Sequence, residues 1–253
     1  MKKIYVPMIQ YGDKEFDEGF IGWGFNSYDQ QIRDAEGVLN IVRKKNMEIL
    51  DVACGLGIYH SVWLKEGHRV TGTDISDTFI FMANQNNGSN PNASYRVENY
   101  YDLNELGKYD LVTIVDFPVD DVELSNNAFR ALKPGGYFVS QVQNPDYKHV
   151  RGPVMRNYRS WTAPPEGNII LTRHEYNAEI DRWEYEEWSV DVDNAEITVQ
   201  HNFSRILSMA QLAEMLVSAG FATVSFLDYN GLPYNPGSEE PKNYFCVAYK
   251  GEY

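Results

Sequence analysis

The chain has 253 residues, 43% of them hydrophobic, which is enough to bury the core of one large domain or of a domain with an insertion. Its formal net charge is −14, and its longest basic run covers only residues 43–45. Because proteins that grip a phosphate backbone need a basic face, this charge argues against a nucleic-acid substrate. We interpret the acidic excess as an aid to solubility rather than as steering of a cationic substrate.

No apolar stretch approaches the roughly 20 residues that cross a bilayer, and residues 1–15 lack the sustained apolar segment of a secretory signal. The two cysteines, Cys54 and Cys246, are interpreted as buried or incidental thiols, which suggests a reducing compartment. No spacing of cysteine and histidine matches a metal site. We therefore expect a cytoplasmic protein with no membrane segment and no bound metal.

Residues 1–46 are predicted to form an N-terminal helical cover. The helical part carries apolar residues at helical spacing, namely Ile32, Ala35, Leu39 and Val42. Before it, residues 20–29 combine aromatic residues with glycines. This earlier segment either packs on the core as a loop or closes over a bound ligand.

Residues 48–76 predict a strand, a glycine turn, a helix and a second, parallel strand. The first strand is a short apolar run of the kind that a fully buried parallel strand shows: Ile49, Leu50, Val52 and Ala53. After the turn at Gly55 and Gly57, apolar residues recur at helical spacing, and Gly67 is a suitable residue for the end of the helix. Asp74 closes the second strand.

The turn has the features of a ligand site. Glycine permits a positive φ, and its missing side chain lets a ligand approach the backbone. The turn opens a helix, whose free N–H groups favour an anionic group such as a carboxylate or phosphate. An acid in the position of Asp74 accepts hydrogen bonds from ribose hydroxyls in folds of this kind. Together these features indicate an adenosine-containing cofactor.

The glycine spacing narrows the choice of cofactor. A dinucleotide fingerprint is G-x-G-x-x-G, with pyrophosphate on the helix N-terminus. Gly55 and Gly57 fill the first two positions, but His60 stands in place of the third glycine or alanine. The carboxylate of Asp51, just before the turn, would repel a pyrophosphate and could bind a cationic amino group. An oxidoreductase with a nicotinamide cofactor is therefore disfavoured, and a turn without any ligand is the other alternative.

The alternation of strands and helices continues along the chain. Ser76 can cap a helix over 77–86, and further strands are expected at 94–99, 109–118 and 137–143. A helix over 122–136 is expected to stop at Pro134 and the two glycines after it. This pattern predicts a doubly wound parallel sheet, with the cofactor beyond the carboxyl ends of its strands.

Residues 144–204 are not required by such a sheet. Their β-rich runs, separated by turn-like segments, predict an antiparallel meander inserted after the fifth strand. Trp183, Tyr185 and Trp188 alternate with Glu184 and Glu186. The alternation fits a sheet with one packed and one solvated face, and it also fits a substrate cap beside the cofactor. The two interpretations are compatible.

The segment ILDVACGLG, residues 49–57, resembles the first motif of class I S-adenosylmethionine (SAM)-dependent methyltransferases, which is a hydrophobic run followed by D-x-x-C-G-x-G. Residues 108–116, 131–139 and 205–228 resemble other parts of that family's fold, and the resemblance covers roughly 25–143 and 205–250. It implies a Rossmann-like α/β fold in one domain over 1–253. The fold would be a doubly wound, seven-stranded, mostly parallel sheet with residues 144–204 as an inserted antiparallel β cap.

The same resemblance implies SAM as the cofactor and suggests, position by position, which residues surround it. Around the methionine part it places Asp51, Ala53, Gly55 and Gly57. Near the ribose and adenine it places Asp74, Ile75 and Phe79, with one of Glu98, Asn99 or Tyr100 near the adenine amino group. Near the sulfonium it places Asp116 and Phe117, although Asp116 also suits the role of a turn cap. From the N-terminal segment, Tyr28 or Trp23 would touch the cofactor.

The implied reaction is in-line transfer of a methyl group from the sulfonium to a nucleophile. The cofactor is already activated, so the enzyme mainly supplies alignment and sometimes a base. Residues 116–119 depart from the [DN]PPY signature of enzymes that methylate amino groups of nucleic acids. We therefore expect a small-molecule acceptor such as a sugar, an amino acid or a secondary-metabolite intermediate, methylated on oxygen or nitrogen. The enzyme would be a monomer or a homodimer. A SAM-binding protein without turnover is the remaining alternative.

The candidate general base is His149, because the loop over 144–152 follows the fifth strand at the carboxyl edge of the sheet. Histidine is the side chain best suited to take a proton near neutral pH. Tyr147 could orient the substrate, and His201, at the far end of the insertion, is the competing base. The alternative is that His149 is a residue of a surface loop.

Overall fold

The computed structural model describes residues 2–5, 12, 14–21, 27–115, 119, 121–143, 157–162, 169–177, 182–204, 207–235 and 243–253. The chain divides into two compact units. One combines residues 1–10 with 144–207, and the other combines 11–143 with 208–253. Each unit contains one β-sheet.

The larger unit is an α/β unit. Its strands are β2 (Glu48–Val52), β3 (Arg69–Asp74), β4 (Ala93–Val97), β5 (Tyr109–Ile114), β6 (Leu132–Gln143), β11 (Thr223–Leu227) and β12 (Asn243–Tyr249). Its helices are α1 (Lys14–Ile21), α2 (Tyr28–Val42), α3 (Ile58–Lys65), α4 (Asp77–Asn87), the 3₁₀ helix η1 (Tyr100–Asp102), α5 (Val122–Ala131) and α7 (Met209–Ser218).

The seven strands follow the order β11-β12-β6-β5-β2-β3-β4. β12 runs antiparallel to both of its neighbours, and the pairs from β6 to β4 are parallel. The predicted seven-stranded, mostly parallel sheet is therefore confirmed. The chain passes from β2 to β3 and β4 on one side and then returns to β5 on the other side of β2. This reversal makes the carboxyl ends of β2 and β5 the switch point where such sheets bind ligands.

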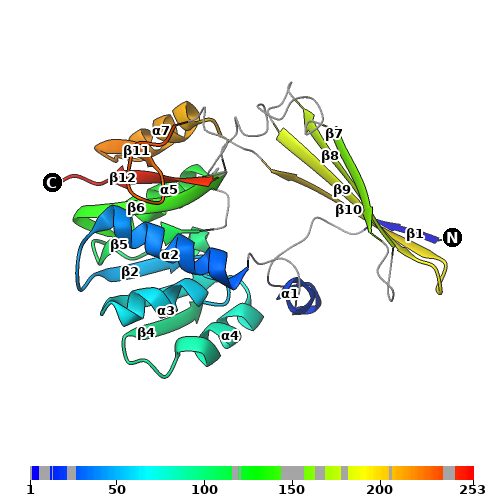
Figure 1. Cartoon of the computed structure of the whole chain (residues 1–253), viewed down its shortest axis with the longest axis horizontal. Coiled ribbons are helices and arrows are strands. Elements are labelled where there is room, and N and C mark those ends of the chain that lie inside the picture. Colours follow the sequence, from blue (N-terminus) through cyan, green and yellow to red (C-terminus); the bar gives the residue numbers. More distant parts are fainter. Residues whose placement is uncertain are drawn as a thin grey trace. The chain divides into compact units, whose positions relative to one another are not determined.

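Helices cover the sheet where the apolar pattern predicts. In Figure 1, α2 and α3 lie in front of the seven-stranded sheet, and these two helices pack against each other. The indole N–H of Trp63 on α3 donates to the carbonyl oxygen of Ala35 on α2 at 3.0 Å. Both residues belong to a buried cluster that includes Ile49 and Leu111 of the central strands. Burial of these apolar side chains stabilises the packing of α2 and α3 on the sheet.

Helix ends follow the capping residues in the sequence. The Ser76 hydroxyl accepts a hydrogen bond from the N–H of Phe79, so α4 begins where predicted. Ser208 and Gln211 form the reciprocal capping box of α7. The end of α5 differs from the prediction. The helix stops at Ala131, and β6 already begins at Leu132, so Pro134 lies within the strand rather than ending the helix.

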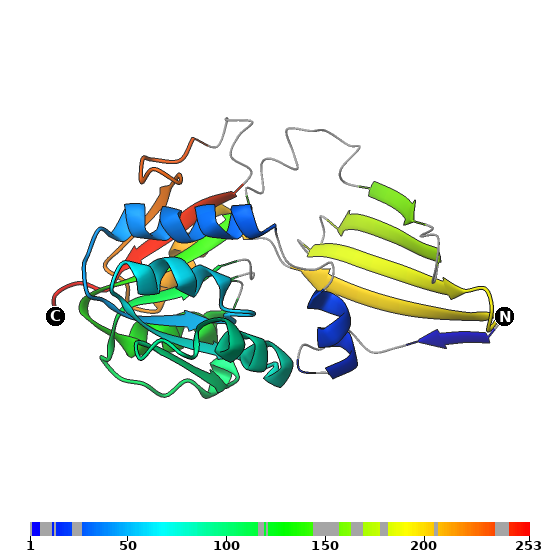
Figure 2. The same ribbon diagram turned by 60° about the horizontal axis from the view of Figure 1, so that its bottom comes forward.

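The smaller unit is a five-stranded sheet in the order β1-β10-β9-β8-β7. Its strands are β1 (Lys2–Tyr5), β7 (Asn157–Thr162), β8 (Ile169–Asn177), β9 (Arg182–Asp191) and β10 (Glu196–Ser204). Strands β7 to β10 are antiparallel, as expected for the insertion, and β1 runs parallel to β10 at the edge, as Figure 2 shows. Residues 2–5 thus form a strand inside a segment for which a helical cover is predicted. Four residues are too few to show a period, and their partners at 196–199 are remote in the chain.

The described side chains of the inserted sheet do not show the predicted contrast between a packed and a solvated face. Among them, Trp188, Glu184 and Glu186 are all partly buried, so burial does not distinguish the two faces. Among the helices that the structure describes, none is long and apolar enough to cross a membrane.

Candidate cofactor site

The turn between β2 and α3 has an unusual backbone. Ala53, Gly55 and Gly57 all adopt left-handed conformations, with φ of 54°, 52° and 66°. Glycine takes this conformation freely, whereas alanine does so at a cost of roughly 1–2 kcal/mol. Backbone strain of this kind persists only where the surrounding structure enforces it, and it is common in ligand sites.

Hydrogen bonds from two backbone N–H groups hold this turn against the end of β3. The N–H of Cys54 donates to the carbonyl oxygen of Thr73 at 2.9 Å, and the N–H of Gly55 donates to Oδ2 of Asp74 at 2.9 Å. Gly57 is the N-cap of α3 and provides no side-chain hydrogen bond to the helix. The first N–H groups of α3 therefore have no side-chain cap and can serve an anionic group of a ligand.

The small size of Gly57 has a packing reason in addition to the ligand approach that the sequence suggests. A Cβ atom on Gly57 would lie 3.2 Å from Cβ of Ala83, 3.2 Å from the hydroxyl oxygen of Tyr95 and 3.3 Å from Nδ2 of Asn87. These atoms belong to the protein, so the missing side chain of Gly57 serves packing as well as the positive φ.

Asp74 stands at the end of β3 with 7% of its surface exposed. Its Oδ1 accepts the N–H of Ser76 at 3.0 Å, and its Oδ2 accepts the N–H of Gly55. Burial raises the pKa of Asp74 to about 6, although these two hydrogen bonds act in the opposite direction; the charges of Asp17 and Asp51 add to the rise. Each carboxylate oxygen keeps a further lone pair, which can accept a hydroxyl of a ribose.

Asp51 lies one residue before the end of β2, as a buried carboxylate with both oxygens hydrogen-bonded. Oδ1 accepts the hydroxyl of Thr113 at 2.6 Å, and Oδ2 lies 2.8 Å from Nε2 of His60. Sequence reasoning places Asp51 in the site but assigns no role there to His60 or Thr113. For His60, the only local signal is that a histidine stands where the dinucleotide pattern has its third glycine. Thr113 has no local signal, because it comes from another strand.

The predicted adenine side of the site is only partly open. Ile75, directly after Asp74, is 44% exposed, whereas Phe79 on α4 is almost fully buried. The side chain of Asn99 accepts the N–H of Tyr101 at 3.1 Å and so caps η1. The Tyr100 ring lies 4.3 Å from that of Tyr101, measured between ring centroids. Of Ile75 and Phe79, only Ile75 therefore offers accessible apolar surface.

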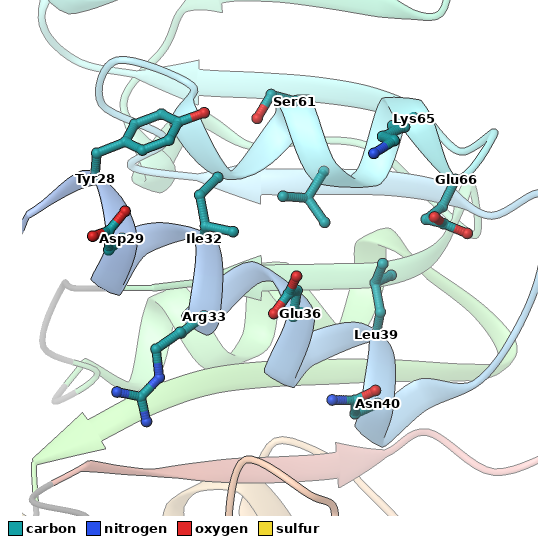
Figure 3. Close-up of a pocket in the computed structure, with 11 residues that line it drawn as sticks. Tyr28, Asp29, Ile32, Arg33, Glu36, Leu39, Asn40, Ser61, Lys65 and Glu66 are labelled. Carbon is teal, nitrogen blue, oxygen red and sulfur yellow. The ribbon is translucent and has the colours of Figure 1, made fainter.

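Tyr28 is 61% exposed at the start of α2, where it borders a groove of about 870 Å³. Figure 3 shows Tyr28 and Ile32 of α2 facing α3, which carries Ser61 and Lys65. The other lining residues are Asp29, Arg33, Glu36, Leu39, Asn40, Val62 and Glu66. The groove runs along the two helices and includes none of Asp51, Gly55 or Asp74. It is separate from the candidate cofactor site.

Several predicted residues are not placed. Trp23, Asp116, Phe117, Tyr147 and His149 lie outside the described residues. His201 belongs to β10 of the smaller unit, and its side chain is not described. Within the described parts of the chain, no group of three His, Cys, Asp or Glu side chains could hold a metal ion. Cys54 and Cys246 are both free and buried.

Comparison with known proteins agrees with this geometry. A family model described as a methyltransferase domain matches residues 49–136, which contain the turn, Asp51 and Asp74. The CcbJ methyltransferase from Streptomyces caelestis superposes with a TM-score of 0.70, covering 94% of this chain and 96% of its own, at 18% identity. Residues 49–136 thus match a methyltransferase domain, and the chain shares the fold of a solved methyltransferase.

Other similar proteins differ in the acceptors that their names give. A ubiquinone biosynthesis O-methyltransferase from Coxiella burnetii is 25% identical over 144 residues, which are 55% of this chain and 62% of that protein. The matched segment is thus less than two thirds of the relative's length. CalS10, an amino pentose methyltransferase from Micromonospora echinaspora, superposes with a TM-score of 0.59 at 14% identity and covers 96% of this chain and 99% of its own. At these identities the two structures show a shared fold.

Proposed function

We propose that the protein is a methyltransferase that transfers a methyl group from SAM to an oxygen or nitrogen atom of a small-molecule acceptor. The observation that carries the proposal is the fastened turn at the carboxyl ends of β2 and β3. There, the left-handed backbone, the N-terminus of α3 without a side-chain cap and two buried carboxylates lie within one hydrogen-bonded unit.

Each group in this unit suits one part of SAM. The Asp51 carboxylate suits the cationic amino group, and the first N–H groups of α3 suit the carboxylate of the methionine part. The Asp74 carboxylate suits the ribose hydroxyls, and the exposed side chain of Ile75 suits the adenine. Bound SAM supplies an activated methyl group, so the task of the protein is to hold the donor in line with the acceptor and to exclude water.

The same groups argue against a dinucleotide. A pyrophosphate on the α3 N-terminus would approach the buried negative charge of Asp51, and His60 occupies the place of the third glycine. SAM carries a cation at this position where a dinucleotide carries an anion. An NAD-dependent oxidoreductase is therefore the weaker proposal.

Three observations support a small-molecule acceptor. The net charge of −14 does not suit a nucleic acid. The names of similar proteins give a quinone pathway in one case and an amino sugar in another. The solved structure that covers 96% of this chain also includes the region of the inserted sheet, which is the part we propose as the acceptor cap. A sugar, an amino acid or a secondary-metabolite intermediate is the acceptor class that we propose.

The general base is proposed from the sequence. β6 ends at Gln143, at the same edge of the sheet as the turn, and the segment with Tyr147 and His149 follows directly. His149 would take the proton of an acceptor hydroxyl, Tyr147 would orient the acceptor, and His201 is the competing base. An amine acceptor attacks with its own lone pair, so alignment without a base is enough for it.

Calorimetry with SAM, S-adenosylhomocysteine and NAD, followed by a methyl-transfer assay against a metabolite panel, tests the proposal. We expect binding of SAM and S-adenosylhomocysteine, no binding of NAD, and release of S-adenosylhomocysteine only when an acceptor is present. Binding of NAD alone would overturn the cofactor assignment. Binding of SAM with no turnover across sugars, amino acids and phenolic or amine metabolites would favour a SAM-binding protein without catalysis.

A further inference from the structure

Four strands of the larger sheet present one row of residues beside the cofactor turn. Asp51 of β2 is in register with Thr113 of β5 on one side and with Gly72 of β3 on the other, and Gly72 is in register with Tyr95 of β4. Neighbouring residues in register on parallel strands point to the same face of the sheet. Three of the four carry hydrogen-bonding side chains, and the fourth is a glycine.

The place above Gly72 is filled by His60 from the first turn of α3. A Cβ atom on Gly72 would lie 2.8 Å from Cε1 of His60, 2.8 Å from Cδ1 of Tyr95 and 2.8 Å from Sγ of Cys54. A glycine inside a strand weakens the strand and often marks a close approach by another group. Here that group is the fully buried imidazole of His60.

The imidazole joins Asp51 to Tyr95 across the strand between them. Nε2 of His60 lies 2.8 Å from Oδ2 of Asp51, and Nδ1 lies 2.8 Å from the hydroxyl oxygen of Tyr95. The rings of His60 and Tyr95 also stack, with centroids 5.4 Å apart. With Thr113 on Oδ1, both oxygens of Asp51 are therefore held in place.

The direction of these hydrogen bonds follows from Tyr95. Burial raises the pKa of Tyr95, so its hydroxyl keeps its proton, and this hydroxyl also receives a hydrogen bond from Asn87. The Tyr95 O–H then donates to Nδ1, and the N–H at Nε2 donates to Asp51. Two hydrogen bonds thus fix the imidazole, and the imidazole in turn orients the carboxylate.

The same network reaches the turn. Nδ2 of Asn87 donates to the carbonyl oxygen of Gly57 at 2.8 Å, and Gly57 is the residue from which α3 begins. A continuous path therefore runs from Thr113 through Asp51, His60, Tyr95 and Asn87 to Gly57. It ties the carboxylate that suits the amino group of SAM to the helix N-terminus that suits its carboxylate.

We propose that His60 is a positioning residue for the amino-acid end of the cofactor. Gly72 leaves space for its imidazole, and Tyr95 holds the imidazole through Nδ1. This inference rests on the proposed use of SAM. Because each oxygen of Asp51 retains a lone pair, the held carboxylate can accept an N–H of the cofactor's ammonium group. A freed carboxylate would turn within its pocket and lose this alignment.

Affinities for two ligands distinguish a positioning role of His60 from a general contribution of His60 to the stability of the fold. S-adenosylhomocysteine carries the amino-acid end, whereas 5′-methylthioadenosine carries the adenine, ribose and thioether without it. In His60→Phe, which fills the space but donates nothing, we expect affinity for S-adenosylhomocysteine to fall about 10-fold or more. Affinity for 5′-methylthioadenosine should stay within about 2-fold of wild type by the same reasoning. His60→Gln, whose amide N–H can still reach Asp51, should recover most of the loss.

The outcomes distinguish this inference from the proposed function. If the wild-type protein binds neither ligand, the use of SAM fails. If the wild type binds both and His60→Phe weakens them equally, or weakens neither, the positioning role fails. Tyr95→Phe serves if His60→Phe does not fold, because it keeps the ring stack and removes only the O–H. It must weaken S-adenosylhomocysteine selectively, since Nδ1 is then free to take the proton from Nε2, and an unchanged ratio of the two affinities overturns the proposal.

Discussion

The backbone N–H of Gly55 donates to Oδ2 of Asp74 at 2.9 Å, and these two residues stand 19 positions apart in the chain. The turn proposed for the methionine part of the cofactor and the acid proposed for its ribose are therefore parts of one unit. A change at either residue acts on both regions of the site. This coupling determines what substitutions at Asp74 should do.

Replacement of Asp74 by alanine should weaken SAM binding by about 1–3 kcal/mol, because it removes charge-assisted hydrogen bonds to the ribose. It also leaves the N–H groups of Gly55 and Ser76 without their acceptor, so the free energy of unfolding should fall by about 1–3 kcal/mol. Calorimetric titration with SAM and urea denaturation measure the two effects. Asp74→Asn, which keeps one acceptor oxygen, should recover part of the stability. Unchanged SAM affinity in folded Asp74→Ala would contradict the ribose assignment.

The raised pKa of Asp74 predicts opposite pH trends for binding and for stability. The folded protein keeps the proton of Asp74 up to about pH 6. The unfolded state releases this proton at the lower pH that is usual for an aspartate. The free energy of unfolding should therefore fall as the pH rises from about 4 to about 6, by on the order of 3 kcal/mol. Urea denaturation of wild type and Asp74→Asn over this window measures the trend, and the variant should lack this part of the slope.

Binding should follow the reverse trend, because the ribose hydroxyls donate to the ionised carboxylate. Affinity for 5′-methylthioadenosine should rise as the pH increases through about 6 and then level off. This ligand has no amino-acid end, so the titration of that end does not contribute. Asp74→Asn is the control, and a pH profile of affinity that is the same in variant and wild type would refute the prediction.

Gly57 and Gly107 form a matched pair of left-handed glycines. Their φ values are 66° and 58°, but a Cβ atom on Gly57 meets three protein atoms within 3.3 Å, whereas one on Gly107 meets nothing within 4 Å. Both alanine variants should lose roughly 1–2 kcal/mol of unfolding free energy from the backbone alone. Only Gly57→Ala should also weaken SAM binding, because it moves the start of α3. Equal SAM affinities in the two variants would show that the turn does not bind the cofactor.

Much of the fold could be predicted because its signals are local. The buried run around Leu50, the glycines that follow it and the helical spacing after them lie within 30 residues of one another, and the structure bears out each element there. The sequence does not predict strand β1, because its pairing with β10 joins residues 2–5 to 196–199. No period in four residues could reveal that pairing.

The candidate site likewise has residues that a local sequence pattern predicts and residues that it does not. Asp51 and Asp74 follow from their places at strand ends, and both lie beside the turn. The sequence singles out His60 only because it stands where a dinucleotide pattern has its third glycine. Its partners Asp51 and Tyr95 belong to different strands, and the space for its ring depends on Gly72 of a third. Such a contact needs the register of the sheet, which a local pattern does not contain.

We propose His149 as the base that takes the proton of a hydroxyl acceptor. The segment with His149 begins where β6 ends, one strand away from β5 and two from β2, so it starts at the carboxyl edge that also carries the cofactor turn. If the acceptor is a hydroxyl, His149→Ala should lower kcat by about 100-fold or more and leave SAM affinity intact. The wild-type pH-rate profile should then show an ascending limb near the titration of a histidine. Under the competing assignment, His201→Ala shows this loss instead. Near-normal kcat at every pH in both single variants and in the double variant would remove both histidines from the mechanism, and alignment of an amine acceptor would then account for the rate.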